Sequence, residues 1–190
     1  MLTDFEGLEK VFKQVVQTPE FKMLQDDFIK SKVIYIIGNG GNMAVASHGA
    51  ADITRLTDKA VYALDSQCIG TSIANDFGYD KLFTRWLEVY ASHSDAQSLV
   101  IGLSGSGNSK NVLSALDWAN NRFNFKCALV SGQNSRALAP GINEVCFDSK
   151  YFHTAEILSL MMIYELVHGC GDSCPTIKEE IIRKWGKDTP

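Results

Sequence analysis

Three serines, Ser104, Ser106 and Ser109, lie close together in the stretch LSGSGNSKNVL, separated by Gly105 and Gly107. The stretch follows an apolar run that ends abruptly at the first serine. Because glycine has no Cβ, the main-chain amides of such a loop can point outward, and serine hydroxyls add donors without adding charge. Free amides at the start of a following helix also attract anions. The pattern predicts a phosphate-binding loop; the alternative is a tight turn with a serine helix cap.

A second small-residue loop, GNGGN at residues 38–42, follows the apolar run at 33–37. It is not the dinucleotide-binding fingerprint, because the Gly-x-Gly-x-x-Gly spacing is missing. Neither loop ends in Gly-Lys-Ser/Thr, so neither is a nucleotide P-loop. Two such loops, each after an apolar run, indicate a binding site more strongly than either loop alone.

Both loops need a scaffold of buried strands, and the sequence predicts one. Apolar runs at 33–37, 60–65, 98–103, 126–132 and 143–148 are typical of strands. Helices are expected at 3–30, 43–56, 80–92, 109–121, 154–169 and 177–185. Pro19 is expected to divide the first helical stretch into two helices. Strands that alternate with helices indicate an α/β fold with a parallel sheet covered on both faces. In such sheets, ligands bind at the carboxyl ends of the strands, where both loops fall.

The chain has 190 residues, which suits a single domain. We expect N-terminal helices over 1–30, an α/β core over 31–170 and a C-terminal tail with a short helix over 171–190. The net charge is −4 and no basic block is present, which argues against direct binding to nucleic acid. Arg55 and Arg85 could reach a phosphate, although solvated arginines are the ordinary case.

The five cysteines are scattered and odd in number, which argues against a secreted disulfide framework. Cys170 and Cys174 could pair at a metal, but two ordinary thiols are the simpler interpretation. The N-terminal residues lack a basic start and an apolar signal core, and no apolar stretch is long enough to cross a membrane. We therefore expect a cytoplasmic protein without a membrane partner.

Three blocks, GNGGNMAVASHGAAD (38–52), SIANDFGYDKLFTRWLE (72–88) and IGLSGSGNSKNVLSAL (101–116), resemble motifs of the sugar isomerase (SIS) domain family. Within that family they are most similar to the phosphoheptose isomerases, which act on sedoheptulose 7-phosphate. The resemblance implies a five-stranded parallel sheet flanked by helices on both faces, and a homotetramer. It covers roughly residues 5–168.

The resemblance also implies site residues. Ser104, Ser106 and Ser109 would hold the phosphate of the sugar, with the Gly105 amide in place of the family's threonine. The sugar itself would be lined by the small and polar residues of the first two blocks, which are Asn39, Gly40, Gly41, Asn75 and Asp76.

The catalytic positions implied by the resemblance are His48, Asp52 and Glu156. His48 and Asp52 are one helical turn apart, so both project from one face. Aspartate replaces the family's glutamate and is one methylene shorter. Isomerisation through an enediol needs a base near the reacting carbons and an acid for the carbonyl oxygen. We predict Glu156 or Asp52 as the base and His48 as the acid, or as a polariser of the carbonyl.

A zinc site is a further implication of the resemblance, which places a Gln and, eight residues later, a His on the late helix. The Gln position falls on Ala155 or Glu156, and the His position falls on Ile163 or Tyr164. Neither pair supplies an imidazole, so we predict no metal ligand and keep zinc only as an alternative cofactor. His153 lies three residues before Glu156 and could face the site with it.

Two classes of function fit these residues. The first is a phosphosugar isomerase that acts on a phosphorylated sugar such as sedoheptulose 7-phosphate. The second is a non-catalytic SIS module that binds a sugar phosphate, or an oligomeric protein-binding adaptor like the replication-initiator-associating SIS proteins. The phosphate loop favours the first class, and the departures at the catalytic positions favour the second.

Overall fold

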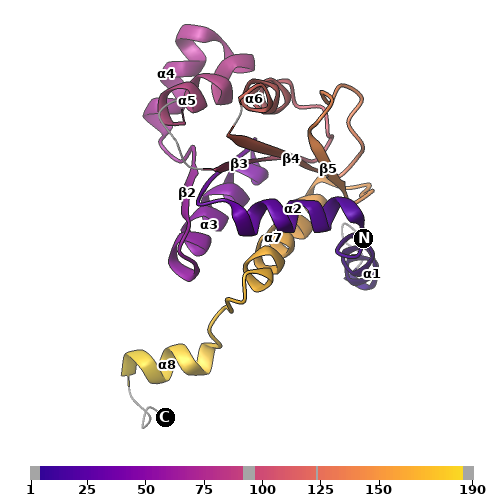
Figure 1. The fold of residues 1–190 in the computed structure, drawn as a ribbon, viewed down its shortest axis with the longest axis vertical. Coiled ribbons are helices and arrows are strands. Elements are labelled where there is room, and N and C mark those ends of the chain that lie inside the picture. The colour runs from indigo at the N-terminus through magenta and orange to yellow at the C-terminus, as the bar shows by residue number, and fades with distance from the viewer. Residues whose placement is uncertain (1–4, 92–96, 123, 186–190) are drawn as a thin grey trace.

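A computed structural model describes residues 5–91, 97–122 and 124–185 (Figure 1). It contains a five-stranded sheet in the order β2-β1-β3-β4-β5, with every neighbouring pair parallel. The strands are β1 (Val33–Gly38), β2 (Ala60–Ala63), β3 (Ser98–Ser104), β4 (Phe125–Ser131) and β5 (Asn143–Cys146). The predicted α/β fold is confirmed.

The described residues contain eight α-helices, and their order follows the predicted one with one addition. They are α1 (Phe5–Val15), α2 (Pro19–Lys30), α3 (Gly41–Leu56), α4 (Gln67–Phe77), α5 (Leu82–Tyr90), α6 (Lys110–Asn120), α7 (Phe152–Gly169) and α8 (Ile177–Trp185). As predicted, Pro19 separates the first two helices: it is the first residue of α2, which Thr18 caps by accepting a hydrogen bond from the Phe21 amide. The sequence pattern did not predict α4, because none of its residues is buried and no apolar stripe marks it.

The sheet separates two hydrophobic cores. Ile34 and Ile36 of β1 face the core formed with α1, α2, α3 and α7, whereas Tyr35 and Ile37 face the core formed with α5 and α6. Figure 1 shows these two helical layers on either side of the sheet. Every residue of β3 is buried, as expected for a central strand covered on both faces.

The strand order creates a switch point between β1 and β3. The chain leaves β1 into α3 on one face of the sheet and leaves β3 into α6 on the other. A crevice forms at the carboxyl ends of two adjacent strands whose connections diverge in this way, and ligands of doubly wound sheets bind there. The two loops singled out in the sequence therefore flank the position where this fold binds ligands.

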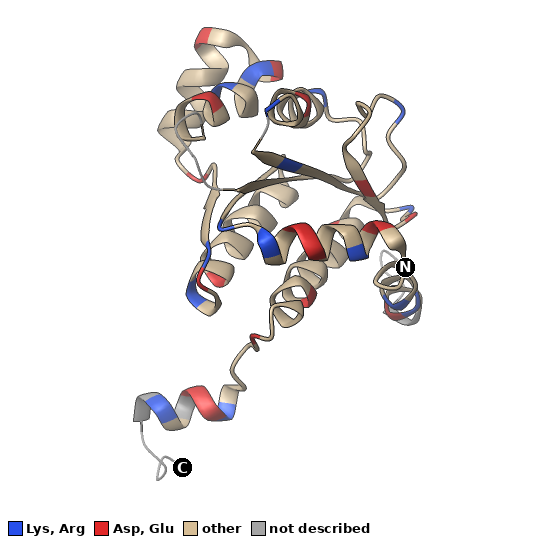
Figure 2. Cartoon of the chain, viewed as in Figure 1, with Lys and Arg blue, Asp and Glu red and all other residues tan. Residues whose placement is uncertain are grey.

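The C-terminal helix α8 projects away from the rest of the chain in Figure 1. The division at residues 30 and 170 stays a prediction. Charges of both signs are scattered over the outer helices, with no concentration of Lys and Arg on the face in view (Figure 2). Among the described residues, no helix combines the length and apolarity needed to span a membrane.

Candidate active site

The loops after β1 and β3 are joined by a reciprocal pair of amide hydrogen bonds. The Asn39 Nδ2 donates to the Asn111 Oδ1 at 2.8 Å, and the Asn111 Nδ2 donates back to the Asn39 Oδ1 at 2.9 Å. Asn111 is buried, so this pair fixes the start of α6 against the start of α3. The Tyr79 hydroxyl also donates to the Asn39 Oδ1, at 2.7 Å. Asn39 therefore holds the two loops in register at the switch point.

The serine loop, residues 104–109, turns sharply between β3 and α6. The Ser104 and Ser109 hydroxyls lie 3.0 Å apart, and the Gly107 amide donates to the Ser104 carbonyl at 3.0 Å. Gly107 has a φ of +68°, and a Cβ there would overlap the Gln133 carbonyl oxygen. Only glycine fits this turn, for both reasons.

Several amides of this loop remain free to bind a ligand. Within the described residues, the amides of Gly105, Ser106, Lys110 and Asn111 donate to no protein acceptor, and Ser109 makes no side-chain cap to α6. The alternative of a plain turn with a serine cap is therefore not what the structure contains. Free amides at a helix start, next to three hydroxyls, form a cradle for an anion.

Replacing Gly107 with alanine should destabilise the fold more than the same change at Gly78. Gly78 also has a positive φ, +83°, but nothing lies near its missing Cβ. Gly78→Ala therefore carries only backbone strain, of order 1–3 kcal/mol. Gly107→Ala adds overlap with main chain, which contributes roughly 1–3 kcal/mol more. Urea denaturation of both variants measures the difference; equal loss of stability would contradict the steric argument.

A pocket of about 440 Å³ opens beside the serine loop and brings two cations to it. Its lining includes Ser106 together with Arg136, after β4, and Lys150, after β5. The sequence reasoning missed both, although each follows a predicted strand and therefore falls at the carboxyl edge of the sheet. The sequence analysis considered two other arginines as phosphate ligands, and both bind carboxylates instead. Arg55 donates to the Asp52 Oδ1 at 3.0 Å, and Arg85 donates to the Glu88 Oε2 at 2.6 Å.

The first turn of α7 lies across both loops. The Phe152 ring covers Gly105, and a Cβ at that glycine would overlap the ring. This contact gives a physical reason for glycine where the family has threonine. One turn later the Glu156 carboxylate lies directly over Gly41, the first residue of α3, where a Cβ would overlap it. The imidazole of His153 lies beside this carboxylate, with the Nδ1 and Oε2 atoms 3.5 Å apart.

From Gly41 onward, α3 and α7 run side by side in the same direction. Two contacts show this: Gly41 lies against Glu156, and Gly49 lies against Ile163. We call this line the α3–α7 seam. His48 is seven residues after Gly41, which places it roughly 10 Å further along α3. The seam therefore leads from the cradle, past Glu156, to His48.

A second cluster of polar groups lies at the far part of the seam. The Tyr164 hydroxyl lies 2.9 Å from the His48 Nε2 and 2.7 Å from the Asp52 Oδ2. Burial raises the pKa of Asp52, but the hydrogen bonds from Tyr164 and Arg55 outweigh burial, so its pKa lies below the ordinary value. Burial, together with the hydrogen bond to Asp52, raises the pKa of Tyr164 to about 12. At neutral pH the cluster therefore contains a carboxylate and a protonated phenol.

The structure brings some predicted residues together and separates others. Glu156 lies near the cradle with Gly41, whereas His48 and Asp52 form the distant cluster with Tyr164. Asn75 and Asp76 are exposed on α4 and bond to each other at 2.9 Å. It is Tyr79, just beyond them, that contacts the loop after β1.

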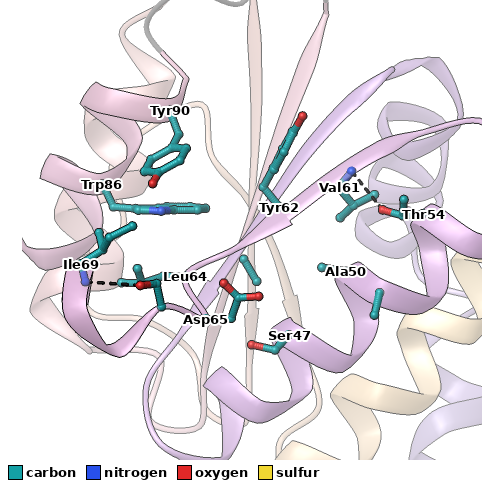
Figure 3. Close-up of a pocket in the computed structure, with 13 residues that line it drawn as sticks. Ser47, Ala50, Thr54, Val61, Tyr62, Leu64, Asp65, Ile69, Trp86 and Tyr90 are labelled. Atoms are coloured by element: carbon teal, nitrogen blue, oxygen red, sulfur yellow. Dashed lines mark hydrogen bonds between the residues drawn. The ribbon is translucent and has the colours of Figure 1, made fainter. Parts of the chain in front are cut away.

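Another pocket, of about 340 Å³, lies at the β2 edge of the sheet (Figure 3). Tyr62, Trp86 and Tyr90 give it aromatic walls, and Asp65 provides the only charge among its lining residues. No lysine, arginine or histidine lines it, so it is unsuited to a phosphate. The serine loop is the better anion site.

With this geometry, the similarity to known proteins can be interpreted. No family model matches the sequence. A phosphoheptose isomerase of Helicobacter pylori is 34% identical over 142 residues, which cover 71% of this chain and 69% of that protein. The chain belongs to the phosphoheptose isomerase family.

Other members of the phosphoheptose isomerase family extend the match. The protein of Fusobacterium nucleatum is 27% identical over 88% of this chain and 89% of its own length. The solved phosphoheptose isomerase of Neisseria gonorrhoeae superposes with a TM-score of 0.72 at 20% identity, covering 86% of this chain and 91% of that one. At that identity, the superposition supports the SIS fold alone.

The structure shows which residues of α7 bring polar groups to the seam. Ala155 and Ile163 are buried apolar side chains, whereas Glu156 contacts Gly41 and the Tyr164 hydroxyl contacts Asp52 across the seam. Of the alternatives that the sequence left open, Glu156 and Tyr164 are therefore the two that bring polar groups to the seam. The sequence reasoning left this choice open and did not name Tyr164 as a site residue.

The residues at the seam do not fit the family's zinc. Tyr164 is a protonated phenol, which is a poor ligand compared with imidazole. In the described part of the chain, no three His, Cys, Asp or Glu side chains gather at a spacing that holds a metal ion. We derive no step through zinc.

Proposed function

We propose that this protein is a phosphosugar isomerase that interconverts an aldose and a ketose phosphate, with sedoheptulose 7-phosphate as the substrate. The observation that carries the proposal is the layout of the seam. An anion cradle lies at one end, and a cluster that can carry protons lies roughly 10 Å further along α3. An extended sugar anchored by its phosphate would place its reacting end away from the cradle.

The cradle supplies binding and orientation. The amides of Gly105 and Ser106, the start of α6 and the hydroxyls of Ser104, Ser106 and Ser109 bind the phosphate, and the two nearby cations attract it. Holding the sugar at its inert end turns binding energy into orientation at the reacting end. Asn39, Gly40 and Gly41 line the path of the sugar, and Asn75 and Asp76 contribute from α4.

The proton-carrying role falls to His48 rather than to the carboxylates. Both Asp52 oxygens are engaged by Tyr164 and Arg55, and the lowered pKa makes this carboxylate a weak base. Within the described residues, His48 makes its hydrogen bond through Nε2 alone, so its Nδ1 is available. Glu156, at the near end of the seam, is placed to accept hydrogen bonds from the sugar hydroxyls.

The proposed reaction transfers one proton between two adjacent carbons of the sugar. His48 takes the proton from the carbon next to the carbonyl while the carbonyl oxygen takes a proton from solvent, which gives an enediol. His48 then returns its proton to the former carbonyl carbon, and the other hydroxyl loses its proton to solvent, which completes the isomerisation. An imidazole suits both directions near neutral pH.

Deuterium exchange tests this function. Incubation with sedoheptulose 7-phosphate in D₂O should place deuterium at C1 and yield the aldose phosphate, both detected by NMR. Binding without exchange would support the second candidate, a non-catalytic sugar-phosphate module or adaptor. The engagement of both Asp52 oxygens is the observation that favours that alternative.

We further propose a cytoplasmic homotetramer. The resemblance to the SIS family supports the assembly, and the five free cysteines suit a reducing compartment. Light scattering coupled to size-exclusion chromatography measures the assembly; a monomer across micromolar concentrations would contradict it.

A further inference from the structure

The single proton of the Tyr164 hydroxyl decides the hydrogen-bond directions in the distant cluster. The Asp52 carboxylate can only accept, and its Oδ2 lies 2.7 Å from the phenol oxygen. The phenol proton therefore goes to Asp52. The contact between the phenol oxygen and the His48 Nε2, at 2.9 Å, then requires the proton to be on the imidazole. The chain of donors runs from His48 to Tyr164 to Asp52.

We infer that Tyr164 is a positioning residue that holds His48 in the Nε2–H tautomer, with its Nδ1 lone pair directed away from the bond and free to take a substrate proton. This inference rests on the proposed isomerase function for its catalytic consequence. It goes beyond that function because it names a residue that acts through another one.

The surroundings of the cluster support this direction. Asp52 is 18% exposed and receives Arg55 on its other oxygen, at 3.0 Å, so it is held as a fixed acceptor. The direct contact between the His48 Nε2 and the Asp52 Oδ2 is long, 3.5 Å, so Tyr164 is needed to link the two. The rings of His48 and Tyr164 meet edge to face, with an interplanar angle of 78°, which limits rotation of the imidazole.

Tyr164 has a role that hydrogen-bond partners of metal-bound histidines have in other proteins. Such a partner accepts a ring N–H and so fixes the tautomer and orientation of the imidazole. Here a neutral phenol does the same for His48 through its hydrogen bonds. The chain would therefore keep an oriented imidazole at the seam without a metal ligand set.

Imidazole NMR tests the inference on the whole protein without any substrate. The chain has four histidines, so ¹H–¹⁵N spectra of the side chains are simple, and His48→Gln assigns the relevant signals. In the wild type, His48 should be a single Nε2–H tautomer with a proton slow enough in exchange to be seen. Tyr164→Phe should remove that proton signal and give mixed tautomers.

Kinetics of the same variant test the catalytic consequence. Tyr164→Phe should lower kcat about tenfold with little change in KM, because the cradle is untouched. Tyr62→Phe is the matched control: Tyr62 is half exposed on β2 and, in the described part of the chain, its hydroxyl makes no hydrogen bond. It should leave both the His48 spectrum and kcat unchanged.

Three results would overturn the inference. They are a His48 spectrum unaffected by Tyr164→Phe, a wild-type His48 protonated at Nδ1, and stoichiometric zinc whose removal by a chelator changes the His48 signals. Circular dichroism shows whether the variant is folded. A wild type without isomerase activity would reject the proposed function, but the NMR result would still decide the role of Tyr164.

Discussion

Replacement of His48 with glutamine is expected to lower kcat for the isomerisation of sedoheptulose 7-phosphate by roughly 100-fold to 10,000-fold, the range for loss of a general acid or base. Glutamine retains a side-chain donor for the Tyr164 hydroxyl but cannot carry a proton between carbons. KM should change little, because the cradle lies roughly 10 Å away along α3. Steady-state kinetics with NMR detection of the aldose product measures the effect.

Two further variants make this result specific to His48. His168→Gln, at the exposed C-terminal end of α7, should be within about twofold of the wild type, since such surface changes are near neutral. Glu156→Gln should act mainly on KM, by about tenfold, because it removes a charged hydrogen-bond acceptor for the sugar. If Glu156→Gln lowers kcat more than His48→Gln does, the base is Glu156.

The part of the site nearest the strands could be predicted from the sequence. Small residues after two apolar runs indicate two loops at the carboxyl edge of a parallel sheet, and the structure places both at the switch point. That prediction depends on local chain properties: glycine at positive φ, and strand ends that must share an edge. The bond between Asn39 and Asn111, 72 residues apart, depends on the strand order and could not be predicted locally.

The part along the seam depends on helix packing and was harder to predict. Whether Ala155 or Glu156 faces α3 is a rotation of about 100° around a helix, and the polar residues of α7 are spread around it, so they form no stripe that fixes the rotation. Once Ile163 packs on Gly49, the next residue, Tyr164, must face His48 and Asp52. The role of Tyr164 therefore follows from one close contact between two helices.

The cations Arg136 and Lys150 were missed for a related reason. Arg136 follows β4 and Lys150 follows the edge strand β5, and only the pairing of these two strands brings both cations beside the serine loop. In the sequence they are isolated basic residues in a chain with a net charge of −4. A positive site can thus form locally in an acidic protein, because loops from several strands end at one edge.

The second large prediction concerns the affinity of the anion cradle for the sugar phosphate. Replacing the exposed Ser106 with aspartate should weaken binding of sedoheptulose 7-phosphate by about 100-fold, close to 2.7 kcal/mol. Two effects combine. A carboxylate near the phosphate repels it by a few kcal/mol at the dielectric of a protein surface. The new side chain can also accept from the free amides of the loop and pair with Arg136 or Lys150, so it fills the site that it blocks.

The variant Ser106→Asn separates the effect of charge on binding affinity from the effect of side-chain size. Asparagine has nearly the same size as aspartate but no charge, so it should weaken binding by no more than about tenfold, the range for one lost hydrogen bond. Calorimetric titration with the sugar phosphate measures both variants, and inorganic phosphate as a competitor reports on the cradle alone. Raising the salt concentration should narrow the difference between them, since screening weakens exposed charges. Equal affinities for the two variants at low salt would mean that the phosphate binds away from the serine loop. A carboxylate at position 106 would repel any anion bound in that loop and so weaken its binding.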